Sequence, residues 1–183
     1  ASGAAFCWGR DTLFQTGGGG DNIAVSSSTP TPAGGNITYK AIATGRNHTC
    51  ALRNDGVAFC WGDNRNGQLG RGVAGAPSDS ALAVTGPTFT QIAAGGNTSC
   101  GLTAAGTVYC WGANESGETG QSLTASTPTP ALVAGTGYTS IAVGGAHACA
   151  LTATGVACWG NNTYGQLGRN FAGGSSAVPT AVT

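Results

Sequence analysis

The feature that most constrains the fold is a repeat of about fifty residues, marked each time by the triplet Cys-Trp-Gly. The triplet begins at Cys7, Cys60, Cys110 and Cys158. Three copies of the repeat are full and one, near the start, is partial: residues 42–72, 92–120, 141–168 and 4–17. A repeat of this length cannot bury its own apolar face, so neighbouring repeats must share a core. The pattern predicts a single repetitive body spanning residues 1–183.

Each full repeat contains four short segments typical of antiparallel strands. They are Ile-Ala-x-Gly, x-x-Cys-x-Leu, a segment ending in Cys-Trp-Gly, and a short segment beside a proline. Four strands in fifty residues are typical of one β-propeller blade. We therefore predict an all-β fold of β-propeller-type repeats, with about three and a half four-stranded antiparallel blades, incomplete alone. The predicted divisions are 1–40 for a partial blade plus a connection, 41–90 and 91–140 for two blades, and 141–183 for a blade lacking its closing strands.

Six cysteines form three pairs that match the register of β-hairpins. Polar and apolar residues alternate on both sides of 54–56, Asn-Asp-Gly, which predicts two strands and a short turn. If Arg53 faces Val57 across this turn, then Leu52 faces Ala58 and Cys50 faces Cys60. A shorter turn in the last repeat preserves this pairing. We therefore predict three disulfides within hairpins: Cys50–Cys60, Cys100–Cys110 and Cys149–Cys158.

The seventh cysteine, Cys7, has no partner at the expected spacing. The pattern would place its partner about ten residues upstream, before Ala1. Three interpretations stay open: the parent chain extends further at its N-terminus, another subunit supplies the partner strand, or Cys7 is a free or intermolecular thiol. The density of disulfides indicates an oxidising location, which is extracellular, at the cell surface or in the periplasm.

Charge and motif content exclude several classes of function. Seven basic and seven acidic residues in 183 give neither a basic footprint for nucleic acid nor a polybasic patch for lipid. No apolar run is long enough to insert into a membrane. With two histidines, His48 and His147, and no Cys-x-x-Cys, we predict no metal site. No catalytic grouping or cofactor motif is present, so we predict a protein without enzymatic activity or cofactor.

The consensus IAxGxxHxCALxxxGxVYCWGxNxxGQLG resembles the repeat of the regulator-of-chromosome-condensation family, in the Cys-bearing version common in secreted bacterial proteins. The resemblance covers nearly the whole chain and implies a propeller that binds proteins. Members of the family include a bacterial β-lactamase inhibitor and a nuclear nucleotide-exchange factor. The family usually closes seven blades. Two copies of this chain would leave Cys-Trp-Gly halves in excess at both joins, which favours a larger parent or a multi-chain assembly.

Several side chains that recur in the repeat are predicted to be structural. The tryptophans after the cysteines should form the core between blades, with carbohydrate stacking as the alternative: Trp8, Trp61, Trp111 and Trp159. His48 and His147 should be held by backbone hydrogen bonds, with pH sensing as the alternative. Asn64 and Asn66 should bond the turn through their side chains, and Gly67 should take positive φ.

The non-repeating loops are the predicted recognition surface of a secreted scaffold that binds a protein or a glycan. They span 10–33, 71–87, 115–130 and 164–176. The candidate binding residues are Arg10, Phe14, Arg65, Arg71, Glu115, Glu118, Tyr164 and Arg169. Two alternatives remain. The chain could be a subunit of an extracellular fibre or surface assembly formed by strand addition with further copies of itself, or a fragment of a longer multi-repeat surface protein.

Overall fold

A computed structural model describes residues 3–18, 26–122 and 125–183, and within these ranges the chain forms strands and turns without a helix. The all-β prediction is confirmed. Parts of two predicted recognition loops, residues 19–25 and 123–124, lie outside the described residues. The strands are β1 (Ala4–Gly9), β2 (Ser27–Thr44), β3 (His48–Arg53), β4 (Ala58–Asn64), β5 (Gly75–Ala83), β6 (Gln91–Gly95), β7 (Thr98–Leu102), β8 (Val108–Ala113), β9 (Ser126–Leu132), β10 (Ser140–Val143), β11 (His147–Thr152), β12 (Gly155–Asn161) and β13 (Ser175–Ala181).

The strands form antiparallel sheets in chain order. β6 to β9 make one four-stranded sheet and β10 to β13 another. The first sheet has the order β1-β2-β3-β4-β5 because the long strand β2 takes part in two pairings. Its first half pairs with β1, where Cys7 faces Thr31, and its second half pairs with β3, where Ala43 faces Cys50. The described residues therefore form three complete blades and one half-sheet, which consists of β1 and the first half of β2.

The last repeat has a complete four-stranded sheet, contrary to our expectation that its closing strands would be absent. β13 pairs with β12, with Cys158 facing Thr180. The expectation counted the next Ile-Ala-x-Gly segment as part of this blade. In the structure that segment is the first strand of a blade, as β6 and β10 show, so the segment beside the proline closes the sheet.

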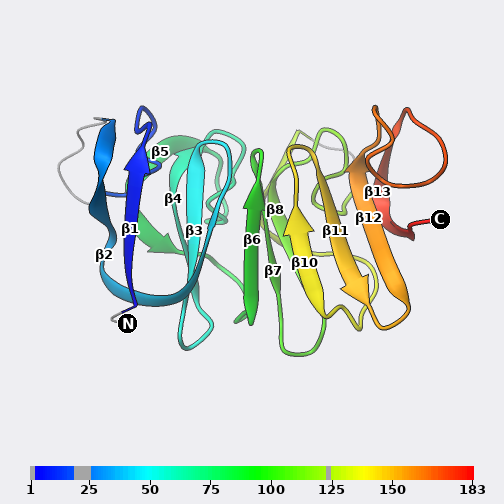
Figure 1. Cartoon of the computed structure of the whole chain (residues 1–183), viewed down its shortest axis with the longest axis horizontal. Coiled ribbons are helices and arrows are strands. Elements are labelled where there is room, and N and C mark those ends of the chain that lie inside the picture. The colour runs from blue at the N-terminus through cyan, green and yellow to red at the C-terminus, as the bar shows by residue number, and fades with distance from the viewer. Residues whose placement is uncertain (1–2, 19–25, 123–124) are drawn as a thin grey trace.

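The blades stand side by side in a row, with the two ends of the chain at opposite ends of the row (Figure 1). Their first strands adjoin: β2 contacts β6, and β6 contacts β10. The backbone N–H of Arg46 donates to the carbonyl of Gly96 at 2.8 Å, which links two neighbouring hairpin tips. This is the fan arrangement of propeller blades around an axis.

Apolar cores lie between the blades, as the repeat length predicted. One core joins Leu52 and Ala58 of the second repeat to Phe89, Ile92 and Trp111 of the next. The next core is built from equivalent positions: Leu102, Val108, Val133, Tyr138, Ile141 and Trp159. A smaller core joins the half-sheet to the first full blade. Each blade is therefore stabilised mainly by its neighbours.

The hairpin registers confirm the three predicted disulfides. Cys50 faces Cys60, Cys100 faces Cys110 and Cys149 faces Cys158, and all three pairs are bonded. Their Cα atoms are 4.1 Å apart in each pair. The turn of the first hairpin closes with Gly56 at φ 88°, a conformation that glycine adopts without strain. Each disulfide covalently links the second strand of its blade to the third.

Candidate protein-binding surface

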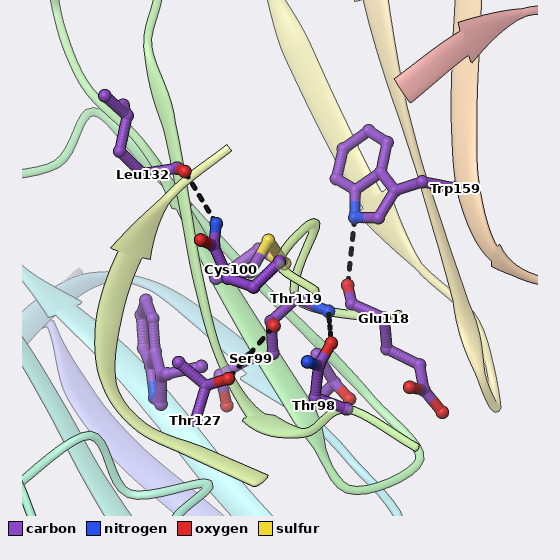
Figure 2. The surroundings of a disulfide bond; sticks show 12 residues. Thr98, Ser99, Cys100, Glu118, Thr119, Thr127, Leu132 and Trp159 are labelled. Atoms are coloured by element: carbon purple, nitrogen blue, oxygen red, sulfur yellow. Dashed lines mark hydrogen bonds between the residues drawn. A yellow bond between two sulfur atoms is a disulfide. The ribbon is translucent and has the colours of Figure 1, made fainter. Parts of the chain in front are cut away.

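In each complete blade, one tryptophan binds the loop of the preceding repeat through an indole hydrogen bond. The indole N–H of Trp61 donates to the carbonyl of Gln15 at 3.2 Å, and that of Trp111 to the carbonyl of Gln68 at 2.9 Å. Figure 2 shows the third contact, from Trp159 to the carbonyl of Glu118, at 2.9 Å. All three rings are fully buried. A buried indole needs such an acceptor, and the repeat supplies one at the same loop position each time.

Trp8 is a correction to the predicted core. Its side chain is 60% exposed, and the described residues offer its indole no hydrogen-bond acceptor. Trp8 stands in the same Cys-Trp-Gly triplet as the other three tryptophans. No blade formed by the described residues lies against its face, however, so the contact that buries the others is not made. Cys7 beside it is half-buried and has no disulfide partner in the structure.

A buried asparagine or aspartate anchors each loop that follows Cys-Trp-Gly. Asn64 accepts a hydrogen bond from the N–H of Leu69 at 3.2 Å and donates to the carbonyl of Val73 at 3.0 Å. Asp11, Asn114 and Asn162 accept equivalent bonds in the other repeats. Gly67 has φ 76°, as predicted. Asn66 was predicted to bond the turn through its side chain. Instead, its backbone N–H donates to the side-chain oxygen of Gln68.

His48 bonds a side chain of the next blade and not the backbone that we predicted. Its Nε2 lies 2.8 Å from the hydroxyl of Ser99, which donates to the carbonyl of Gln68 at 3.0 Å. Since that hydroxyl proton is already used, Nε2 must carry the proton that His48 donates. Burial, opposed by the charge of Asp63, lowers the pKa of His48 to about 4, so the ring is neutral near pH 7. The histidine is part of the blade interface.

Three arginines line a hollow of about 610 Å³ beside the β2–β3 turn. Arg10 follows β1, Arg46 lies in the β2–β3 turn, and Arg65 lies in the loop after β4. The wall also includes Asn47, Asp63 and Asn97. We call this the arginine hollow. It gathers three of the seven basic residues of an otherwise neutral chain.

The charges in the arginine hollow are only partly compensated. Asp63, almost fully buried, accepts from the guanidinium of Arg65 at 2.9 Å. Burial opposes the ionisation of Asp63, but the hydrogen bonds from Arg65 outweigh it and lower the pKa of this carboxyl. Arg10 donates to the hydroxyl of Thr12 at 3.0 Å, and the exposed Arg46 side chain makes no hydrogen bond or ion pair within the described ranges. Two guanidinium groups therefore remain available to an anionic ligand.

The other predicted loop residues do not gather into one site. Glu115 and Tyr164 are exposed, the latter to 90%, on the loops of different repeats. Arg71 and Arg169 are half-buried, and Arg169 donates to the carbonyl of Cys158 at 3.0 Å. Burial lowers the pKa of Arg71.

Two of the predicted binding residues, Phe14 and Glu118, are part of the loop structure of their own repeats. Phe14 is half-buried and adopts φ 62° at a turn position where the other repeats have glycine. Glu118 is buried: its carboxylate accepts from the N–H of Ser116 at 2.8 Å, while its carbonyl accepts from Trp159. Because glutamine occupies the same position in the other repeats, alignment of the repeats could have identified Glu118 as structural.

The sequence reasoning missed Arg46, Asn47 and Asn97 as part of a candidate site. They lie in repeated hairpin turns, which belong to the framework of the repeat. A usable signal was present: position 46 is arginine where the other two full repeats have glycine, at Gly96 and Gly145. Within the described residues no three metal-ligating side chains cluster, and no helix is long and apolar enough to cross a membrane.

The fold and the blade contacts together define a β-propeller repeat protein, and comparison with known proteins names the family. The pattern described as the regulator of chromosome condensation (RCC1) repeat matches residues 39–68, 89–118 and 138–166, and a second form of it matches 55–102 and 105–151. The matches cover more than half of the sequence. The chain belongs to the RCC1 repeat family.

Among solved structures, the chain is similar to Prp20p of Saccharomyces cerevisiae, with a TM-score of 0.85 and 24% identity over 97% of this chain and 46% of that one. It is also similar to human WBSCR16, with a TM-score of 0.83 and 23% identity over 97% and 47% of the two chains. At these identities the likeness shows the fold alone. The propeller architecture is thereby confirmed.

Two curated relatives match shorter stretches. Human HERC6, a probable E3 ubiquitin-protein ligase, is 40% identical over 70 residues, which are 37% of this chain and 7% of the relative. Mouse RCC2 is 36% identical over 89 residues, or 46% of this chain and 16% of the relative. The chain thus spans a small part of these curated relatives and less than half of the similar solved structures.

Proposed function

We propose that this chain is a non-enzymatic propeller scaffold that binds an acidic segment of another protein in the arginine hollow. The observation that carries the proposal is the convergence of Arg10, Arg46 and Arg65 from three separate segments on one hollow. Guanidinium groups bind carboxylates through paired hydrogen bonds, and two of these three are not engaged by a carboxylate. Aspartate and glutamate side chains of a partner would complete the arrangement.

Two further points support a protein ligand over the glycan that the sequence left open. Prp20p, which shares this fold, binds Gsp1p and histones, so protein binding has a precedent on the same architecture. Glycan stacking would need an aromatic ring at the site, and no aromatic side chain lines the arginine hollow. The repeats form a rigid frame, and the hollow lies on the turns that join their strands.

The proposal also includes a location outside the cytoplasm, extracellular or at the cell surface, with the periplasm as the bacterial equivalent. Three disulfides in one short chain are typical of oxidising compartments. The Cys-bearing, secreted bacterial type of the family is the version that fits this location.

The test measures binding of a fluorescent peptide of alternating glutamate and glycine to the intact, oxidised protein. Arg46→Glu should weaken binding at least tenfold, and binding should weaken further as salt is raised. Arg53→Glu is the matched control, because it makes the same charge change at the opposite end of β3, where Arg53 pairs with Asp55. Equal losses in the two variants would show a non-specific charge effect and contradict the proposal.

A second candidate is a structural subunit that assembles end to end, within a longer repeat protein or between copies. Both ends of the row expose large apolar side chains: Phe6 and Trp8 at one end, and Leu151, Val156 and Val182 at the other. In the interior, equivalent side chains are covered by the next blade. Size measurement with and without reductant tests this candidate. A discrete monomer with one alkylatable thiol would contradict assembly between copies.

A further inference from the structure

Charge is distributed unevenly along the row of blades. Residues 1–71 contain six basic and four acidic residues, whereas residues 72–168 contain three acidic residues and no lysine or arginine. The first stretch therefore has a formal net charge of +2 and the second of −3. The arginine hollow, apart from Asn97, is built from the first stretch. A ligand that extends from the hollow toward the next blade meets residues of opposite net charge.

The three acidic residues of the second stretch differ in accessibility. Glu118 is buried, and its carboxylate accepts from the N–H of Ser116. Asp79 is half-buried on the edge strand β5, where it accepts from the hydroxyl of Ser80. Glu115 is exposed, and its carboxylate makes no hydrogen bond or ion pair with the part of the chain that the structure describes. Of the three, Glu115 is the carboxylate that is free to bind a ligand.

A backbone hydrogen bond places Glu115 beside the arginine hollow. Two residues before it, the N–H of Ala113 donates to the carbonyl of Asn97 at 2.9 Å, and Asn97 lines the hollow. The turn that contains Asn97 is also joined to the turn of the preceding blade, where the N–H of Arg46 donates to the carbonyl of Gly96. Glu115 thus follows directly on a segment that is bonded to the wall of the hollow.

The preceding repeat has the same arrangement, and there the equivalent side chain lines the hollow. The N–H of Asp63 donates to the carbonyl of Asn47 at 2.8 Å, and Arg65 lies two residues further along. Arg65 and Glu115 occupy the same position in the repeat, in the loops after β4 and β8 of adjacent blades (Figure 1). The two side chains therefore start from equivalent positions, one blade apart, on the face of the row that carries the hollow.

This loop position changes its charge from one repeat to the next. It is occupied in turn by Thr12, Arg65, Glu115 and Thr163. A ligand with negative charge alone would be attracted by the hollow and repelled at Glu115. A ligand whose charge changes sign along its length would be attracted at both places, and such complementarity determines register and partner choice more than overall affinity.

We propose that the partner's acidic segment also carries a lysine or arginine that pairs with Glu115. The segment would lie along the row, with its acidic residues over the arginine hollow and its basic residue over the next blade. This inference rests on the proposed function and adds to it the orientation of the partner and a residue that selects it. An exposed ion pair contributes little to affinity, about two- to fivefold at low salt. Glu115 is therefore a specificity residue of the site.

The test compares fluorescent peptides that bind the intact, oxidised protein. Each peptide contains the run of alternating glutamate and glycine, then a linker of about four glycines, which reaches up to about 14 Å when extended. One peptide of a pair ends in lysine and the other in glutamine, with both chain ends blocked to remove the terminal charges. A second pair carries the linker and the variable residue before the acidic run, so that both chain directions are covered. Fluorescence polarisation at low salt gives the affinities.

In at least one pair, the lysine peptide should bind the wild-type protein about threefold more tightly than the glutamine peptide. Glu115→Gln should remove this advantage. Glu115→Lys should reverse it, a result that loss of folding cannot produce. Asp79→Asn is the matched control, because it removes one negative charge from the same stretch of the chain on the edge strand β5, and it should preserve the advantage.

The variant Arg46→Glu distinguishes failure of this inference from failure of the proposed function. If it weakens binding of both peptides while lysine gives no advantage, or gives one that Glu115→Gln leaves intact, the pairing with Glu115 is wrong and the site for acidic segments remains. Equal losses of the advantage in Glu115→Gln and Asp79→Asn would show a long-range charge effect and would also overturn the pairing. If Arg46→Glu weakens binding of neither peptide, the arginine hollow is not the site and both proposals are wrong.

Discussion

The half-sheet at the start of the row and the blade of β6 to β9 carry the same Cys-Trp-Gly motif in different surroundings. In the blade, Cys110 is bonded to Cys100 and Trp111 is fully buried against the preceding repeat. In the half-sheet, Cys7 has no disulfide partner and Trp8 is mostly exposed. The local backbone is alike, with φ 108° at both Gly9 and Gly112. The motif therefore sets the local conformation, while neighbouring strands determine the burial, the disulfide and the stability.

The largest expected effect is the loss of stability when a buried tryptophan is replaced by alanine. Trp111→Ala should lower the free energy of unfolding by about 3–5 kcal/mol, because it empties a core position between two blades and leaves the carbonyl of Gln68 without its indole donor. Trp8→Ala should change it by less than about 1 kcal/mol. Urea unfolding followed by circular dichroism measures both. Similar losses of stability at the two positions would contradict this difference between the half-sheet and the blade.

The next effect is a pH dependence centred on His48. Its pKa is about 4 in the folded protein and near 6.5 when unfolded, so the unfolded state binds more protons between these values. Stability should therefore fall as pH drops from about 6.5 to 4, by up to about 3 kcal/mol. His147, half-buried on the last blade with its pKa lowered by burial, should contribute less. Urea titrations of His48→Gln and His147→Gln should show that the former flattens the pH profile more than the latter.

The disulfides should differ in their resistance to reduction. Cys100 and Cys110 are fully buried between blades, whereas Cys149 belongs to the end blade and is half-buried. Under native conditions dithiothreitol should reduce Cys149–Cys158 first, as alkylation and peptide mapping would detect. Loss of an interior disulfide, through Cys100→Ala with Cys110→Ala, should cost about 2–3 kcal/mol in urea unfolding. Earlier reduction of the interior pair would contradict this order.

The smallest effect concerns the thiol of the half-sheet. Burial, together with the charge of Asp11, raises the pKa of Cys7. Cys7 should therefore react with iodoacetamide more slowly than free cysteine at pH 8, and the ratio should approach one as pH rises and both thiols ionise. Faster reaction than free cysteine would show that the site stabilises a thiolate.

Sequence reasoning predicted those features that depend on contacts within a hairpin. The positions opposite each other, Leu52 with Ala58 and Cys50 with Cys60, follow from alternation and turn length, which are local. Repetition also predicted that blades share cores, and the burial of Trp61, Trp111 and Trp159 confirms it.

The failures concern contacts between blades. Trp8 was assigned to the core because it lies in the same Cys-Trp-Gly triplet as its equivalents, but burial depends on the neighbouring blade. His48 was assigned a backbone partner, whereas Ser99, fifty-one residues away, lies across the blade interface. The arginine hollow was recognised in part, since Arg10 and Arg65 were among the candidate binding residues, whereas Arg46, in a repeated hairpin turn, was not. Convergence of separate turns is set by the packing of blades, which no single repeat encodes.

Exchange of the four indole N–H protons with solvent, followed by nuclear magnetic resonance, tests most directly that neighbouring blades complete each other. Trp61, Trp111 and Trp159 donate to carbonyls of the preceding repeat and are buried, so their signals should persist in D₂O. The signal of Trp8 should disappear within the dead time. Four signals that decay alike would contradict the account.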